Sequence, residues 1–311
     1  MRVVFLGNDP WSVPSVEALD AAGDIDIDLV ITNPPRPAGR GSRLTSTAVA
    51  DAARGLGVEI LETEGVAGGA GRDAVVRLHP DAIVVVAYGE ILTPEILATP
   101  RLGAVNLHFS LLPRWRGAAP VHRAILEGDH HTGVSVMLLD EGLDTGPVLA
   151  SLDEAIAPDD DAGRLGERLA RRGAPLLVDT LRELDAGTAT PLPQPSAGAT
   201  YAAKLSPGER VIDWLDPADP IVRRVRALAP VPGATTTFRG APLKVLRAEI
   251  RDAAPAPARP GDLLLDADGT PLVAVTEATV ALLEVAPAGR ARMSGTEWAR
   301  GARLVSGDRA G

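Results

Sequence analysis

The chain has 311 residues, of which 45% are hydrophobic and 23% are charged, a composition typical of a soluble globular protein with one large or two modest domains. It contains no cysteine, which excludes disulfides and thiolate metal sites, and its net charge of -10 argues against a protein that coats nucleic acid. The apolar stretch Val3–Leu6 is too short for a signal peptide, and no apolar run reaches the roughly 20 residues of a membrane span. We therefore expect a cytoplasmic protein with no membrane partner.

In the first part of the chain, strand-like and helix-like segments alternate. Strands are predicted at Arg2–Leu6, Asp28–Thr32, Val58–Leu61, Asp81–Ala87 and Ala104–His108, and helices at Pro14–Ala22, Asp73–Leu78 and Asp161–Leu184. The run Asp81–Ala87 is nearly continuous in apolar, β-branched residues, as in a strand buried on both faces. The alternation predicts an α/β fold with a Rossmann-like, mostly parallel sheet, in which ligands bind at the carboxyl ends of the strands.

A second, smaller domain is predicted after Ala186–Thr200, a segment whose Pro, Ala and Thr content is that of a linker. Beyond it, short apolar runs separated by turn residues predict a small all-β barrel. Its five strands are expected at Thr235–Phe238, Leu243–Arg247, Asp262–Leu265, Leu272–Thr276 and Ala278–Glu284. The predicted division is a first domain at 1–186, a linker at 187–204 and a barrel domain at 205–311.

The most informative polar residues are Asn106 and His108, which lie two apart at the end of a predicted strand and so point to the same side. An amide that donates to an oxygen gaining negative charge, beside an imidazole that stabilises this charge or handles a proton, suits transfer of an acyl group. Polar residues at a strand end can also do no more than hold the following loop. From this pair alone, both interpretations stay open.

An acidic, glycine-rich turn at Leu139–Pro147 follows the predicted strand Gly133–Leu139. One of its carboxylates, among them Asp144, could orient the histidine or take up a proton through water. Any tight turn also selects Asp and Gly, so a purely structural role is an equal alternative. Other chemistries have little support, because the chain lacks a dinucleotide-binding G-x-G-x-x-G after its first strand, a Walker motif and a G-x-S-x-G elbow. The adjacent pair His130 and His131 is not spaced for a metal on one helix face, and we expect no metal.

Several motifs together carry a family resemblance over nearly the whole chain. They are NLHFSLLPRWRGAAP at 106–120, LDEGLDTGP at 139–147, PPRPAGRG at 34–41, VVVAYGEIL at 84–92 and TYAAKLSPGERVIDW at 200–214. With these motifs the chain resembles the formyl-tetrahydrofolate-dependent formyltransferase family, and within it the branch that formylates methionyl-tRNA. The resemblance implies a Rossmann-like domain followed by an OB-like barrel. It also implies 10-formyltetrahydrofolate as donor and the methionyl amino group of initiator tRNA as acceptor, giving N-formylmethionyl-tRNA for translation initiation.

The resemblance also assigns residues. Asn106, His108 and Asp144 fall on the family's catalytic positions, and Arg40 falls on a loop arginine that reaches the acceptor end of the tRNA. The family's folate-binding segment falls on Ser110, Leu111, Leu112 and Pro113. Further candidates for contact with tRNA phosphates are Arg36, Arg43, Arg114 and Arg116, together with the barrel arginines Arg223, Arg224 and Arg226, for which a solvated helix face is the alternative.

Some positions depart from the family pattern. Phe109 stands where a small residue or Pro is frequent, His122 where Gln is common, and Ser42 and Arg43 where a more basic pair is frequent. The Pro-, Gly- and Arg-rich segment Asn33–Ser46 that contains the last two is either functional or a flexible surface insertion.

Three rival functions remain at this stage. One is a formyltransferase acting on a purine-pathway glycinamide, a second acts on a nucleotide sugar, and a third is a non-catalytic folate-binding or RNA-binding module. The glycinamide enzyme would leave the PAGRG loop and the C-terminal residues unexplained. For the oligomeric state we expect a monomer.

Overall fold

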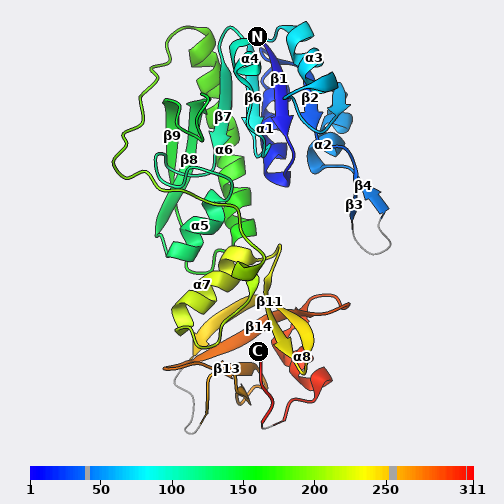
Figure 1. Ribbon diagram of the computed structural model, residues 1–311, viewed down its shortest axis with the longest axis vertical. Coiled ribbons are helices and arrows are strands. Elements are labelled where there is room, and N and C mark those ends of the chain that lie inside the picture. The colour runs from blue at the N-terminus through cyan, green and yellow to red at the C-terminus, as the bar shows by residue number, and fades with distance from the viewer. Residues whose placement is uncertain (39–42, 252–257, 306) are drawn as a thin grey trace. The chain divides into compact units, whose positions relative to one another are not determined.

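The computed structural model describes residues 1–38, 43–251, 258–305 and 307–311 (Figure 1). Contacts divide the chain into two compact units. The first unit comprises Met1–Pro120, His131–Ala155 and Gly166–Ala202, and the second comprises Val121–His130, Ile156–Leu165 and Ala203–Gly311. Among the helices of the described residues, none combines the length and apolar character that crossing a bilayer requires.

A seven-stranded sheet, counted over the described residues, forms the centre of the first unit, in the order β5-β2-β1-β6-β7-β8-β9. Its strands are β1 (Arg2–Gly7), β2 (Asp26–Thr32), β5 (Ile60–Glu62), β6 (Ala82–Val86), β7 (Ala104–His108), β8 (His131–Leu138) and β9 (Val148–Ala155). The five strands from β5 to β7 pair in parallel, whereas β8 and β9 pair antiparallel. The predicted Rossmann-like, mostly parallel sheet is therefore confirmed. The carboxyl ends of β1, β6 and β7 lie at one edge, where ligands of such sheets collect.

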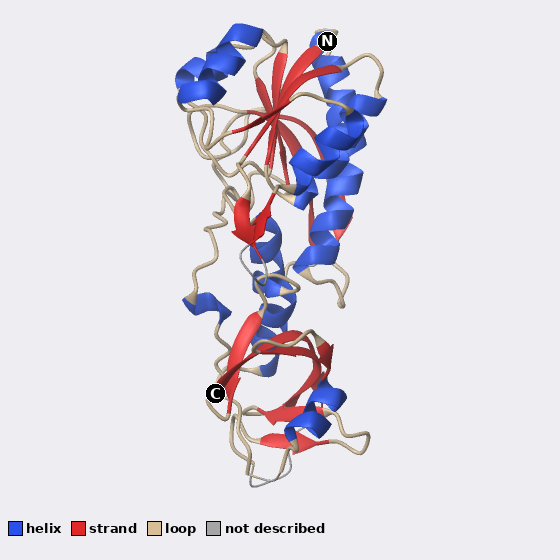
Figure 2. Cartoon of the chain, turned by 90° about the vertical axis from the view of Figure 1, so that its right-hand side faces the viewer, coloured by secondary structure: helices blue, strands red, loops and turns tan. Residues whose placement is uncertain are grey.

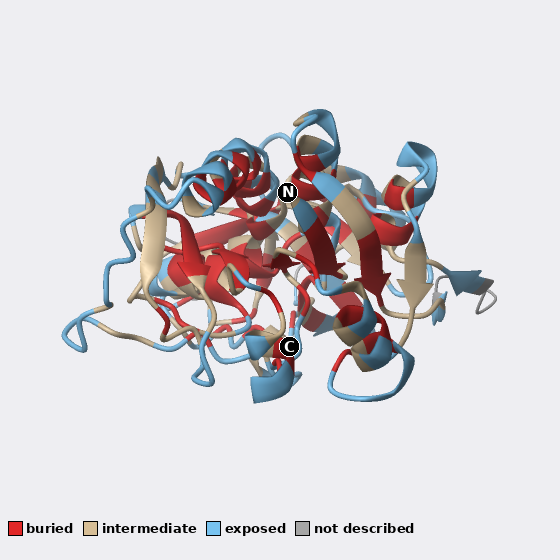
Figure 3. Cartoon of the chain, turned by 90° about the horizontal axis from the view of Figure 1, so that it is seen from above, coloured by how far each residue is buried: buried red, intermediate tan, exposed pale blue. Residues whose placement is uncertain are grey.

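Helices flank this sheet, and local sequence sets their ends. They are α1 (Val13–Ala21), which follows a short 3-10 turn at Pro10–Ser12, α2 (Ala48–Leu56), α3 (Gly69–Leu78), α4 (Pro94–Ala98) and the later residues of α6 (Ala162–Asp185). For α2, the Thr47 side chain accepts the Ala50 N–H and Gly57 ends the helix at φ 76°. Figure 3 shows the sheet strands largely buried and the outer helix faces exposed, as amphipathic helices on a buried sheet require.

Besides the helices α2 and α4, the strands β3, β4 and β9 of this unit were not predicted. A short antiparallel pair, β3 (Arg36–Ala38) and β4 (Arg43–Thr45), forms inside the segment expected to be a loop. The edge strand β9 alternates half-buried and exposed residues and lacks the long apolar run that marks a central strand. The segment expected to be a linker runs along the first unit: Leu192 exchanges backbone hydrogen bonds of 2.8 and 2.9 Å with Val148.

The second unit contains an antiparallel sheet in the order β10-β11-β14-β13-β12, with β15 pairing to β14. Its strands are β10 (Ala234–Phe238), β11 (Ala241–Arg251), β12 (Leu263–Leu265), β13 (Pro271–Ala274), β14 (Thr279–Pro287) and β15 (Met293–Ser294). Isolated bridges join Ala310 to Phe238 and Arg309 to Asp262, so the C-terminal residues link the two edge strands into the ring visible in Figure 2. The five predicted strands are confirmed, and β15 is an addition.

Two helices of the same unit, α7 (Ala218–Leu228) and α8 (Gly295–Ala302), pack against the barrel strands. The helix α5 (Pro120–Glu127) belongs to this unit from Val121 onward. Val225 and Leu228 of α7 and Trp298 of α8 join one buried cluster with Val245 and Val273 of the sheet. Arg224 on α7 pairs with Asp216 at 3.0 Å, and Arg226 donates to the carbonyls of Asp160 and Ala157 at 2.7 and 2.9 Å. These two arginines therefore have structural partners within their own unit.

Candidate active site

The strand β7 places Asn106 and His108 side by side at the carboxyl edge of the sheet. The register sets Asn106 opposite Val85 of β6 and Met137 of β8, and His108 opposite Ser135 of β8. Asn106 is 8% exposed and His108 is 5% exposed. Within the described part of the chain, no group hydrogen-bonds the Asn106 carboxamide. Its N–H donors are therefore available to a bound molecule, as a donor to an oxyanion must be.

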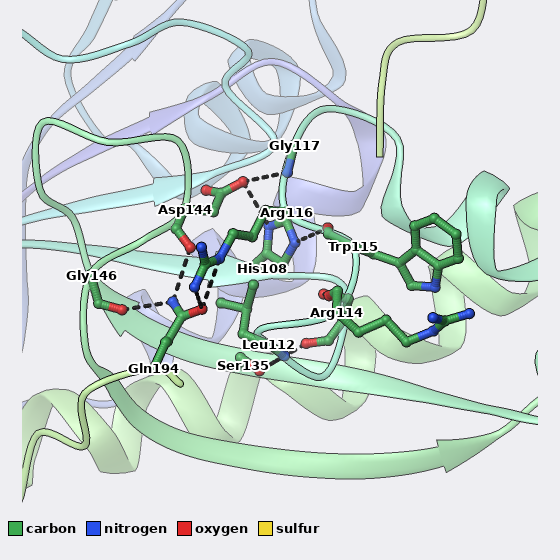
Figure 4. Close-up of polar contacts among 11 residues, drawn as sticks. His108, Leu112, Arg114, Trp115, Arg116, Gly117, Ser135, Asp144, Gly146 and Gln194 are labelled. Atoms are coloured by element: carbon green, nitrogen blue, oxygen red, sulfur yellow. Dashed lines mark hydrogen bonds and ion pairs between the residues drawn. The ribbon is translucent and has the colours of Figure 1, made fainter. Parts of the chain in front are cut away.

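A backbone carbonyl orients the His108 ring (Figure 4). His108 Nε2 lies 2.9 Å from the carbonyl oxygen of Trp115, and a carbonyl can only accept, so Nε2 carries a hydrogen. The other nitrogen, Nδ1, faces Asp144 Oδ2 at 3.7 Å, which is too long for a direct hydrogen bond. Asp144 thus acts on the ring through charge or a bridging water, while the Trp115 carbonyl fixes its orientation.

The carboxylate of Asp144 is held by the backbone. Its Oδ2 accepts the Gly117 N–H at 2.7 Å. Three residues around His108 have positive φ, namely Trp115 at 63°, Gly117 at 119° and Asp144 at 51°. Such values are uncommon for non-glycine residues and concentrate at functional sites, where the surroundings hold them. Of the carboxylates in the acidic turn, the structure therefore brings Asp144 to the histidine.

The predicted folate-binding segment forms a tight loop after β7. The Ser110 hydroxyl donates to the Arg114 carbonyl at 2.6 Å, and the Leu112 N–H donates to the Ser135 hydroxyl at 3.1 Å. Ser135 in turn donates to the Ser110 carbonyl at 2.8 Å. The loop is thus fixed to β8 by buried serines, while Leu111, Leu112 and Pro113 keep partly exposed surfaces.

Gln194 is a polar residue of this region that the sequence did not single out. Its amide nitrogen donates to the carbonyls of Asp144 and Gly146 at 2.9 and 2.7 Å, and its amide oxygen accepts from Arg116 at 2.8 and 3.1 Å (Figure 4). Gln194 lies in a Pro- and Ala-rich stretch with no periodicity, so the sequence offered no signal for it.

The five arginines proposed for tRNA differ in their surroundings. Arg36 is exposed on β3, Arg40 lies outside the described residues, and only the backbone of Arg43 is described, on β4. The Arg114 guanidinium stacks 4.4 Å above the Trp115 ring. Arg116 is only 7% exposed and is engaged by Gln194, an environment that favours a structural contact over a phosphate contact.

Two positions that depart from the family pattern are buried. Phe109 is in edge contact with Trp11, with ring centroids 5.7 Å apart, and so packs into the core of the first unit. In the second unit, burial of the imidazole lowers the pKa of His122 to about 4, with a smaller contribution from the neighbouring positive charge of Arg123. His122 is therefore uncharged at neutral pH.

Two models of known protein families match most of the chain. Residues 1–181 match the formyl transferase family model and residues 204–303 match the model of the formyl transferase C-terminal domain. The methionyl-tRNA formyltransferase of Halorhodospira halophila is 46% identical, with 99% of this chain and 98% of that protein covered. The methionyl-tRNA formyltransferase of Thermobifida fusca is 44% identical, with 100% and 99% covered.

Solved structures share the fold at low identity. HypX from Aquifex aeolicus, solved in complex with tetrahydrofolic acid, superposes with a TM-score of 0.67 at 16% identity over 96% of this chain and 47% of that one. An N-formyltransferase from Helicobacter canadensis, solved with folinic acid and dTDP-3-aminofucose, gives 0.65 at 14% identity over 90% and 98%. The family models and the full-length relatives show that the chain belongs to the formyl transferase family, in its methionyl-tRNA formyltransferase branch.

Proposed function

We propose that the protein transfers the formyl group of 10-formyltetrahydrofolate to the methionyl amino group of initiator methionyl-tRNA. The observation that carries this function is the meeting of Asn106, His108 and Asp144 at the end of β7, in a chain that matches methionyl-tRNA formyltransferases over its full length. The product, N-formylmethionyl-tRNA, serves translation initiation.

The geometry supports direct attack of the amine on the formyl carbon. The new C–N bond forms as the carbonyl oxygen becomes negative, and the Asn106 amide donates to this oxygen. His108 offers Nδ1, the ring atom not used by Trp115, to the same oxygen when it carries a proton. The tetrahedral intermediate collapses by breaking the bond to the folate nitrogen.

The reaction moves one proton from the attacking amine to the departing folate nitrogen, and Asp144 is placed to carry it. The attacking amine must lose one proton, and the folate nitrogen gains one as it leaves. Asp144, fixed by Gly117 beside His108, takes the amine proton through water, and the proton reaches the departing nitrogen. No covalent intermediate with the enzyme is needed.

The choice of acceptor is tested by offering three candidate acceptors, each in its own reaction. Purified protein is incubated with 10-formyltetrahydrofolate and, in separate reactions, methionyl initiator tRNA, a glycinamide ribotide and an aminosugar nucleotide. We expect formylation of the methionyl-tRNA alone, detected by mass spectrometry of the released amino acid. Formylation of the aminosugar nucleotide without that of the tRNA would assign the protein to the rival branch.

The loop arginines are proposed to contact the acceptor end of the tRNA, on the basis of the family resemblance around Arg40. Replacing Arg40 by alanine is expected to lower kcat/KM for methionyl-tRNA about tenfold and to reduce the slope of log kcat/KM against log salt by roughly 0.7 to 0.9, as expected for one lost phosphate contact. The KM for the formyl donor should not change.

Arg77→Ala is the matched control for this prediction, because Arg77 is an exposed arginine in the last turn of α3 and its loss changes the net charge equally. Equal salt slopes for Arg40→Ala and Arg77→Ala would contradict a role for Arg40 at the tRNA.

We further propose that residues 1–186 form the catalytic domain and that residues 205–311 form the barrel domain, which contacts tRNA. Residues 187–204 connect these two domains. The family models, which end at residue 181 and begin again at residue 204, support this division. A monomeric state and a cytoplasmic location stay predictions from the sequence.

A further inference from the structure

We propose that Gln194 is a positioning residue for formyl transfer, because it holds the turn that carries the Asp144 carboxylate. This inference rests on the proposed function only in its kinetic part. Among the described residues, no hydrogen bond joins Gln194 to His108 or Asn106, and Gln194 reaches Asp144 through its backbone carbonyl. It therefore acts on the reaction through Asp144.

Every hydrogen-bonding group of the Gln194 side-chain amide has a partner. Both hydrogens of its nitrogen are donated, one to the Asp144 carbonyl and one to the Gly146 carbonyl. Its oxygen accepts two hydrogen bonds from the Arg116 guanidinium. Since a guanidinium has no acceptor and a carbonyl has no donor, the amide can satisfy these partners in one orientation only.

The turn needs this support. Asp144 has a φ of 51°, a conformation that costs energy for a residue with a Cβ and persists only where the surroundings hold it. Asp140 supports the start of the turn by accepting from the Gly142 N–H and the Thr145 hydroxyl at 3.0 and 2.7 Å. Gln194 supports its end, and the Asp144 side chain then meets the Gly117 N–H.

Arg116 gives Gln194 a rigid support. The guanidinium is buried, and the backbone of Arg116 exchanges hydrogen bonds with Thr200 and Ala202, at 2.9 and 2.7 Å. Thr200 also accepts the Trp115 N–H at 2.9 Å, next to the carbonyl that orients His108. The segment 194–202 thus hydrogen-bonds both the loop with Trp115 and Arg116 and the turn with Asp144. Gln194 makes the contact with the turn.

The first experiment compares Gln194→Glu, Gln194→Ala and, as matched control, Ser196→Ala, an exposed position of the same segment. Gln194→Glu keeps the oxygen that faces Arg116 but places an acceptor against two carbonyls. We expect kcat to fall roughly 10- to 100-fold in both Gln194 variants, because both lose the two hydrogen bonds to the carbonyls of the turn. The KM for folate and for methionyl-tRNA should stay within about threefold. Wild-type values are expected for Ser196→Ala.

The second experiment repeats these substitutions in an Asp144→Asn background. If Gln194 acts through Asp144, its replacement should then change kcat less than about twofold, as expected for two groups that act as a unit. A full loss that persists in this background would assign Gln194 to the general architecture of the segment and overturn the proposal. Loss of cooperative unfolding in both Gln194 variants would overturn it in the same way.

A third measurement needs no substrate. Hydrogen exchange of the Gly117 amide, which donates to Asp144, should be roughly tenfold faster in Gln194→Glu than in the wild type and unchanged in Ser196→Ala. An unchanged Gly117 amide would contradict the proposal. A wild-type protein that formylates no acceptor would contradict the proposed function, and the exchange measurement would still decide the role of Gln194.

Discussion

Replacing Asn106 by alanine is expected to lower kcat roughly 100- to 1000-fold, the usual effect of removing one donor to an oxyanion. The Asn106 carboxamide is nearly buried at the end of β7. It would meet a negatively charged oxygen only as the tetrahedral intermediate forms. Its loss should therefore leave the dissociation constant of the folate within about threefold, because that interaction belongs to the transition state.

Asn106→Asp separates loss of a donor from loss of volume. Aspartate has the same shape but presents acceptors, and ionised it would repel the developing oxyanion, so its kcat should be no higher than that of Asn106→Ala. Folate binding is followed by calorimetry and folding by thermal melting, with kcat from single-turnover formylation. Near-normal turnover in Asn106→Ala, or a loss confined to folate affinity, would remove Asn106 from the mechanism.

The sequence was informative about the part of the site that one strand builds. β7 is a short apolar strand, and residues two apart on a strand share a face, so Asn106 and His108 could be placed together before any coordinates. The strand also follows β6, whose continuous β-branched run predicts a central position. The fold around the site was predictable for the same reason, since burial on both faces leaves a clear pattern.

The rest of the site depends on backbone contacts that leave no such pattern. The ring of His108 is oriented by the backbone carbonyl of Trp115, seven residues further along the chain. Every residue type has this carbonyl, so the contact leaves no mark in the sequence. Asp144 reaches His108 through a turn with positive φ, and a side chain 50 residues away supports this turn. The residues of the acidic turn alone could therefore not show which carboxylate meets the histidine, and Asp144 was assigned through the family resemblance.

Composition alone does not show that the segment after α6 also contacts the site. Its Pro, Ala and Thr content is that of a linker, yet it carries Gln194 and Thr200 to the loops of the site. A chain that pairs through isolated backbone bridges and single side chains needs no apolar periodicity. Such a segment is indistinguishable from a solvated linker until its hydrogen-bond partners are known.

Replacing Asp144 by asparagine is expected to lower kcat roughly 100- to 10,000-fold, the range over which a group that accepts a proton contributes to rate. Asparagine has the same shape and can still accept the Gly117 N–H, so the turn should keep its conformation. What is lost is the negative charge 3.7 Å from His108 Nδ1 and the capacity to take the proton of the amine. The KM for both substrates should change little.

Glu141→Gln is the matched control for Asp144→Asn, because it removes the same charge from the same turn at an exposed side chain. We expect its kcat to stay within about twofold of the wild type, since a distant exposed charge is screened by solvent. An equal loss in both variants would show that the reaction needs the net charge of the turn, and Asp144 would then have no specific role with the proton. A loss confined to Asp144→Asn, with an unchanged melting temperature, ties the rate to one carboxylate whose position depends on Gly117 and Gln194.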